Sequence, residues 1–340
     1  MKSCRALLLV AGLSAALLNV GLPRAQGPQE RPAGLTAERI CDGPLLFGVS
    51  IGPVIPFALY DSGQWTNIWP KIYSSSIADR KSRYSPDRLG QRLIRTLGQT
   101  GRLPAQWWFM PLEGEPKPIE VKEVFWLETH CTWNWALRTE VPLVPPQCKD
   151  CCPEPVAGIV SNSRCFGRPF KRVPPGSSLA ASILSELRAR FEAEESRQIA
   201  RLVEDYGSSS GFPLEAGERR VTPFKDVSVW QTPPRSGTPT LIYLCAVREY
   251  PEPECVSPSV FSAWLRQEEG APPSAVELRV ELTDCDYKGA SRIRPVTTVQ
   301  VGSGEFVIVE SGAWEGLEYE VLEVTSASVT TKVSTWTSDF

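Results

Sequence analysis

Short apolar segments separated by turn residues fill most of the chain after residue 41, and they predict a mainly β protein. The clearest example includes Val276, Glu277 and Leu278, where apolar and charged residues alternate as in a half-buried antiparallel strand. Gly302-Ser303-Gly304 lies between two apolar runs and predicts a hairpin. Strands are predicted at residues 45–51, 57–60, 64–69, 119–127, 129–139, 227–230, 241–247, 276–282, 296–301, 305–310 and 317–324.

Helical periodicity is confined to a few segments. Ser85-Pro86-Asp87 combines an N-cap with a proline at the first helical position, and leucines then recur every four residues until Gly98. The longest predicted helix covers residues 178–206, and a short one is predicted at 259–268. The stripe of the long helix consists of Ile183, Leu187, Phe191, Ile199, Leu202 and Tyr206.

These elements predict an α+β fold, mainly antiparallel β, with two β-rich regions, one long amphipathic helix and few short helices. The 31 prolines agree with many turns and short strands. The predicted organisation is a signal peptide at 1–25, a flexible lead-in at 26–40, an N-terminal β-rich domain at 41–175, the amphipathic helix at 176–206, a linker at 207–220 and a C-terminal β-rich domain at 221–340.

The first 25 residues have the composition of a secretory signal peptide. Lys2 and Arg5 precede an apolar run of about 15 residues, which is shorter than the ~20 residues that a membrane-spanning helix needs. Cleavage is expected between about residues 21 and 27; the alternative is an uncleaved anchor helix. We therefore expect a secreted or periplasmic protein without a transmembrane helix after signal removal.

Export makes disulfides the expected state of the cysteines. One specific pair is predicted, Cys245 with Cys255, because the end of a strand and the following loop would meet across Pro251 and Pro253. An odd number of cysteines leaves at least one thiol free or intermolecular. The candidates after residue 25 are Cys41, Cys131, Cys148, Cys151, Cys152, Cys165, Cys245, Cys255 and Cys285.

The alternative use of these cysteines is a zinc site, since Cys148 and Cys151 have Cys-x-x-Cys spacing and His130 is next to Cys131. Strand alternation places His130 and Cys131 on opposite faces, which disfavours a shared metal. We therefore expect no metal and no cofactor.

No complete catalytic motif is present. Asp61-Ser62-Gly63 resembles the triplet of aspartic proteases, but its only counterpart is Glu310-Ser311-Gly312, so a hairpin turn is the preferred interpretation. The only histidine, His130, would have to serve any histidine-dependent mechanism. Asp284 and Asp286 are too few ligands for a calcium site.

Tryptophan and charge are unevenly distributed. Trp107 and Trp108 are candidates for stacking on a ligand, although burial in a β core would give the same pattern. Residues 71–102 carry eight Lys or Arg and two Asp, whereas residues 305–323 carry six Glu and no Lys or Arg. Loss of residues 1–25 lowers the net charge from -3 to about -6, which argues against binding nucleic acid.

The sequence leaves three classes of function open, the third of which is a cysteine-dependent metal or redox role. The first is a non-enzymatic binding or structural module of the cell envelope or extracellular space, with a glycan or protein partner. The alternative is a hydrolase that acts on glycans or peptides through carboxylates distant in sequence. The sequence does not decide whether the protein is an enzyme.

Overall fold

The computed structural model describes residues 41, 43–68, 86–97, 104, 106–112, 114–128, 133–141, 157–206, 216–251, 256–283, 292–302, 304–313 and 316–337. By its contacts the chain divides into Met1–Glu38 and Arg39–Phe340, and all described residues belong to the second unit. The predicted signal peptide and lead-in, at 1–25 and 26–40, lie outside the described residues.

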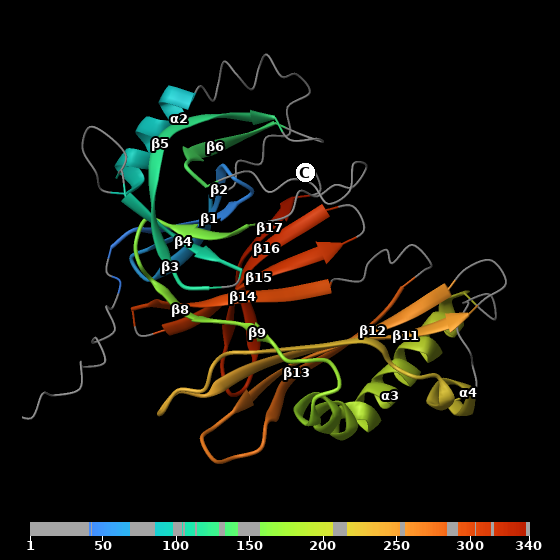
Figure 1. Ribbon diagram of the computed structural model, residues 1–340. Coiled ribbons are helices and arrows are strands. Elements are labelled where there is room, and N and C mark those ends of the chain that lie inside the picture. The colour runs from blue at the N-terminus through green and yellow to red at the C-terminus, as the bar shows by residue number, and fades with distance from the viewer. Residues whose placement is uncertain are drawn as a thin grey trace, which may run out of the picture. The chain divides into compact units, whose positions relative to one another are not determined.

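The described chain forms three antiparallel sheets, so the prediction of a mainly antiparallel β fold of the α+β class is confirmed (Figure 1). In the first sheet the strand order is β1-β7-β4-β5-β6-β2-β3, and β1 also pairs with β2, so six of the strands form a closed ring of pairings. Its strands are β1 (Leu45–Ser50), β2 (Val54–Asp61), β3 (Gln64–Asn67), β4 (Gln106–Pro111), β5 (Lys117–Glu128), β6 (Trp133–Thr139) and β7 (Gly158–Ser161).

The other two sheets have five strands each and cross the predicted domain division. The order β13-β12-β11-β10-β9 joins β9 (Lys171–Arg172) to β10 (Lys225–Gln231), β11 (Thr240–Pro251), β12 (Val256–Gln267) and β13 (Ser274–Leu282). The order β17-β16-β15-β14-β8 joins β8 (Phe166–Pro169) to β14 (Arg292–Val301), β15 (Gly304–Ala313), β16 (Gly316–Val324) and β17 (Val329–Thr337). The short strands β8 and β9 thus pair with strands that follow residue 221.

Both main helix predictions are confirmed by α2 (Pro86–Thr96) and α3 (Ser178–Tyr206). A third helix, α4 (Ala216–Val221), lies at the end of the predicted linker. Among the described helices, none is long and apolar enough to cross a membrane.

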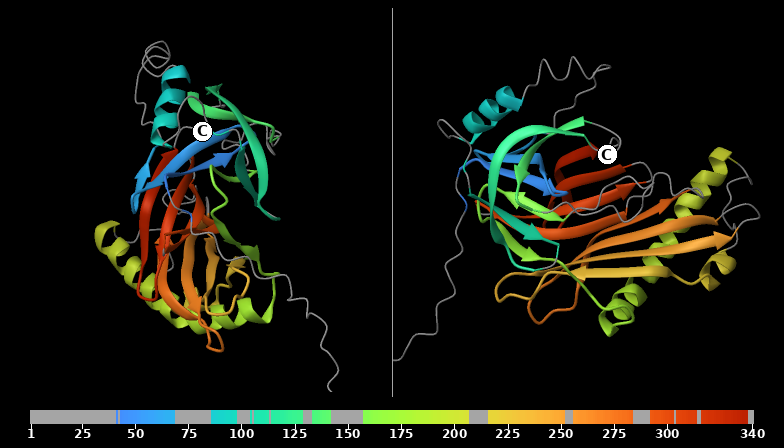
Figure 2. Two further views of the ribbon diagram at one scale, coloured as in Figure 1. Left: turned by 90° about the vertical axis from the view of Figure 1, so that its left-hand side faces the viewer. Right: turned by 45° about the horizontal axis from the view of Figure 1, so that its top comes forward.

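The sheets stack through alternating residues of their strands. On β15, Phe306 and Ile308 join the core shared with β1 and β2, while Val307 and Val309 face the sheet that contains β11 and β12. The other face of β11 and β12 packs against α3, which lies along β11–β13 (Figures 1 and 2). The order of layers is therefore helix, sheet, sheet and strand ring.

A buried ionic cluster fastens α3 to its sheet. Arg248 on β11 is fully buried, and its Nη1 donates to Glu195 Oε2 at 3.0 Å. Tyr250 donates its hydroxyl to Glu195 Oε1 at 2.6 Å, and Arg219 of α4 lies 3.9 Å from Glu195 Oε2. Water does not reach these buried charges, so each must be paired with another group of the protein, as it is here.

The helix predicted at 259–268 is wrong, because this segment belongs to strand β12. Each residue from Val256 to Gln267 pairs with one of β11, and Val260 and Phe261 are buried on opposite faces. A central strand covered on both sides has no polar alternation, so its periodicity resembles that of a buried helix. Strands β4, β7, β8, β9 and β17 were not predicted.

Candidate functional site

A groove of about 750 Å³ opens where the chain passes from one sheet to the next. Strands β8 and β9 are the edges of their sheets, and Phe170 alone lies between them in sequence. We call this groove, lined by residues 111–112, 114–115, 157, 169–172, 230 and 294–296, the basic groove. Its volume lies within the ~300–1,000 Å³ typical of ligand pockets.

The apolar part of the basic groove is anchored in the protein core. Phe170 and Val296 are buried, and the Phe170 backbone N–H donates to Val296 O at 3.0 Å. Trp230 is half-buried, and its ring centroid lies 6.0 Å from that of Tyr243. Because neighbouring side chains hold these residues, the apolar surface is formed before any ligand arrives.

Three cationic side chains line the same groove. Arg172 on β9 is the cross-strand partner of Trp230, and its guanidinium lies 5.9 Å from the indole centroid. It also donates from Nη2 to Ser228 Oγ at 2.9 Å. Arg294 pairs through Nη2 with Glu310 Oε1 at 2.8 Å, while Lys171 is exposed.

One cation of the groove lacks an acceptor within the described residues: Lys171 has neither an ion pair nor a side-chain hydrogen bond there. Arg294 Nε also has no hydrogen-bond partner, but this atom is buried and a ligand in the groove does not reach it. Glu115 is the only acidic residue in the described lining. The groove is therefore suited to a negatively charged ligand. Its described lining holds one carboxylate, whereas glycoside hydrolysis generally uses two.

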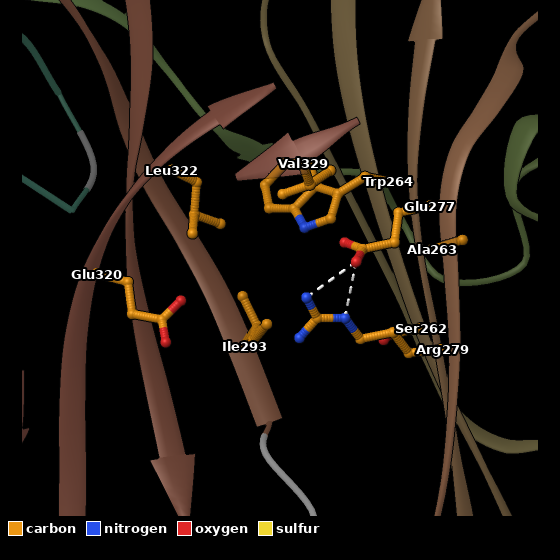
Figure 3. Close-up of a pocket in the computed structure, with 9 residues that line it drawn as sticks. All are labelled: Ser262, Ala263, Trp264, Glu277, Arg279, Ile293, Glu320, Leu322 and Val329. Atoms are coloured by element: carbon orange, nitrogen blue, oxygen red, sulfur yellow. Dashed lines mark hydrogen bonds and ion pairs between the residues drawn. The ribbon is translucent and has the colours of Figure 1, made fainter. Parts of the chain in front are cut away.

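A second cluster of charges lies between β13 and β16 (Figure 3). Arg279 donates to Glu277 Oε1 from Nε at 3.0 Å and from Nη2 at 2.9 Å. Glu320 directs its carboxylate toward the side of Ile293 and Arg279. Burial raises the pKa of Glu320 to about 7; the carboxylates of Glu318 and Glu277 add to the rise, and Arg279 opposes it.

This second cluster has a protonatable carboxyl near neutral pH but no room for a substrate. The cavity among Glu277, Arg279 and Glu320 measures about 10 Å³, and Trp264 and Leu322 help to close it. Such a volume is about that of one water molecule. A sugar or peptide residue does not fit, so the pair Glu277 and Glu320 is not the catalytic site of a hydrolase acting on polymers.

The predicted stacking residues Trp107 and Trp108 do not line the basic groove. Trp107 is fully buried and donates its Nε1 proton to Pro104 O at 2.7 Å, so it belongs to the core and the prediction for it is wrong. Trp108 is half-buried, and the guanidinium of Arg164 lies 5.1 Å from its ring centroid. Trp230, in contrast, lines the groove.

Of the cysteine predictions, the structure contradicts one pair. Cys41 and Cys165 form a disulfide with a Cα–Cα distance of 5.9 Å. Cys245 is a buried free thiol, so the predicted Cys245–Cys255 bond is wrong. In the β11–β12 ladder Cys245 pairs with Ser262, and Cys255 itself lies outside the described residues.

The remaining cysteine candidates, Cys131, Cys148, Cys151, Cys152, Cys255 and Cys285, lie outside the described residues. His130, Asp284 and Asp286 also lie there. In the part of the chain that the structure describes, no three His, Cys, Asp or Glu residues are grouped to hold a metal ion.

Asp61-Ser62-Gly63 forms the turn of the β2–β3 hairpin, as the sequence predicts. Asp61 pairs with Gln64, and Ser62 and Gly63 have φ angles of 50° and 82°. Two positive φ angles in succession are typical of a type I′ hairpin turn. The counterpart Glu310 lies on β15 and pairs with Arg294.

The residues of the basic groove had a signal in the sequence. Residues 164–172 contain four Lys or Arg and no acidic residue, with Phe166 and Phe170 among them. Basic residues interleaved with aromatic ones favour contact with an anion. Only the fold, however, places Trp230 and Arg294 beside Lys171 and Arg172.

Comparison of the chain with models of protein families, with curated proteins and with solved structures yields no match.

Proposed function

We propose that the protein is a non-enzymatic binding module of the cell envelope or extracellular space, and that its ligand occupies the basic groove. The observation that carries this proposal is the groove itself: about 750 Å³, with the apolar side chains of Phe170, Val296 and Trp230 beside three cations. Ligand sites commonly combine an apolar lining with a few fixed polar groups.

The disulfide supports the part of the proposal that concerns export. Cys41 and Cys165 are both buried, and disulfides persist mainly in oxidising compartments. Together with the predicted signal peptide, this favours a secreted or periplasmic protein. This part is tested by expressing the whole chain and measuring the mass of the exported protein. We expect to recover the protein outside the cytoplasm, and its chain should be shorter by roughly 21–27 residues. Recovery only as the full-length intracellular chain contradicts it.

Two tryptophan variants test the binding site. Trp230 and Trp108 are both half-buried, and each has an arginine guanidinium near its ring, but only Trp230 lines the groove. We expect Trp230→Ala to weaken ligand binding at least about tenfold, as the loss of a buried aromatic contact does in other binding sites. Trp108→Ala is expected to leave binding unchanged.

The measurement is binding of labelled oligosaccharides and peptides to the oxidised protein, after circular dichroism has shown that both variants are folded. Binding that is lost in Trp108→Ala and kept in Trp230→Ala contradicts the proposal. Absence of binding to every ligand of the panel contradicts it as well.

A further inference from the structure

We infer that the ligand of the basic groove is an anionic polysaccharide, with its acidic groups bound by Lys171, Arg172 and Arg294 and its sugar rings lying against Trp230. This inference rests on the proposed function, because it names the chemistry of a ligand for the same groove.

The charge of the groove indicates an anionic ligand. Three cations and one anion line it within the described residues. The basic character is local, since the whole chain has a net charge of -3. Glu310 pairs with Nη2 of Arg294, whose side chain is 39% exposed, and the Lys171 side chain has no ion pair or hydrogen bond in the described chain. An acidic ligand would supply an acceptor to Lys171 through charge-assisted hydrogen bonds, which are stronger than neutral ones.

The surroundings of Trp230 indicate that the ligand contains a sugar ring. Its indole offers apolar surface, and the Arg172 guanidinium lies 5.9 Å from the ring centroid. A sugar ring has apolar C–H surfaces and, in an acidic sugar, a charged group at its edge. Trp230 therefore suits the apolar face of such a ring, and the neighbouring guanidinium of Arg172 suits its charged group.

The backbone of the groove argues against an acidic peptide as the ligand. Extended peptides that bind in grooves gain much of their affinity from main-chain hydrogen bonds to a strand edge. Pro111, Pro169 and Pro295 line the groove and have no backbone N–H to donate. The edge strand β9 consists of two residues, Lys171 and Arg172. A peptide would thus find few backbone partners, whereas a sugar does not need them.

A matched pair of ligands tests the inference directly. Oligogalacturonate and its fully methyl-esterified form have the same rings and linkages, but only the first is charged. Calorimetric titration of the full chain, with the Cys41–Cys165 disulfide oxidised, is expected to show at least about tenfold tighter binding of the acid form, because the ester cannot form the charge-assisted hydrogen bonds. A phosphate-bearing polysaccharide and poly-glutamate serve as further arms.

Three charge variants locate the interaction. Lys171→Gln, Arg172→Gln and Arg294→Gln are each expected to weaken binding of the acid form several-fold and to reduce its dependence on salt. Arg197→Gln is the matched control, because it removes one positive charge from the exposed surface of α3. It is expected to leave binding unchanged.

The outcomes separate this inference from the proposed function. Tighter binding of either the uronate or the phosphate polysaccharide supports an anionic polysaccharide and identifies the acidic group. Equal binding of the acid and the ester, lost in Trp230→Ala, overturns the inference but leaves the groove as a binding site. Preference for poly-glutamate overturns it in favour of a peptide. Absence of binding to every arm overturns the proposed function itself.

Discussion

Glu320 shows how the position of one side chain makes folding depend on pH. The raised pKa of about 7 means that the folded protein holds this proton at pH values where the unfolded chain, with an ordinary value of 4.5, has released it. The free energy of unfolding should therefore fall as the pH rises from about 4.5 to about 7, because the folded state binds more protons over this range. Below pH 4.5 this contribution vanishes.

We predict that Glu320→Gln removes this dependence. At pH 8 the variant should be more stable than the original protein by about 1–2 kcal/mol, less than the pKa rise alone implies because the side chain is partly exposed. At pH 4 the two proteins should have equal stability. Urea denaturation at several pH values measures this.

Glu323→Gln is the matched control for that measurement. Glu323 lies on the same strand and pairs with Lys332 at 2.7 Å, but it does not line the cavity at Glu320, so the fall in stability between pH 4.5 and 7 should persist in this variant. A profile for Glu320→Gln that still falls between pH 4.5 and 7 would mean that another group carries the dependence.

At the scale of elements, the attachment of α3 depends on a charged residue within an apolar stripe. Ile183, Leu187, Phe191 and Ile199 are buried as predicted, and Glu195 occupies the position between the last two on the same face. The buried stripe predicted from the sequence does not include Glu195, because glutamate is normally exposed. Its partner Arg248 is distant in sequence, and only the packing of α3 on β11 reveals the pair.

We predict that Glu195→Ala destabilises the protein by about 3–5 kcal/mol, because it leaves the charge of Arg248 buried without its main partner. Glu194→Ala, one residue away on the exposed side of α3, should cost much less. Replacing both partners, as Glu195→Leu with Arg248→Met, should recover a large part of the loss. Chemical denaturation compares the variants, and equal losses for Glu194→Ala and Glu195→Ala would falsify this account.

Sequence patterns predicted elements well where one face of the element is polar. The alternation in β13 and the turn residues of the β14–β15 and β2–β3 hairpins are visible in the chain itself. Predictions failed where burial removed that contrast, as in β12, or where a strand is too short to show a period, as in β8 and β9. Long-range pairing stabilises such segments, and a local pattern does not contain it.

At the scale of the whole molecule, the fold class was predictable but the candidate site was not. The basic groove combines residues at and just after the end of β4, residues of β8–β9, Trp230 of β10 and Arg294 of β14. These residues meet because β8 and β9 join two different sheets. Two adjacent tryptophans suggested a stacking site, yet strand alternation turns Trp107 into the core and away from any ligand.

The most direct test of the central claim is amide hydrogen exchange, followed by mass spectrometry, with and without saturating acidic oligosaccharide. Bound ligand should slow exchange in peptides that cover residues 111–115, 169–173, 228–231 and 293–297, since these segments surround the basic groove. Peptides of α3 should exchange at the same rate in both samples. Slowed exchange confined to the region of Trp108, or to any surface away from the groove, would contradict the assignment of the groove as the ligand site.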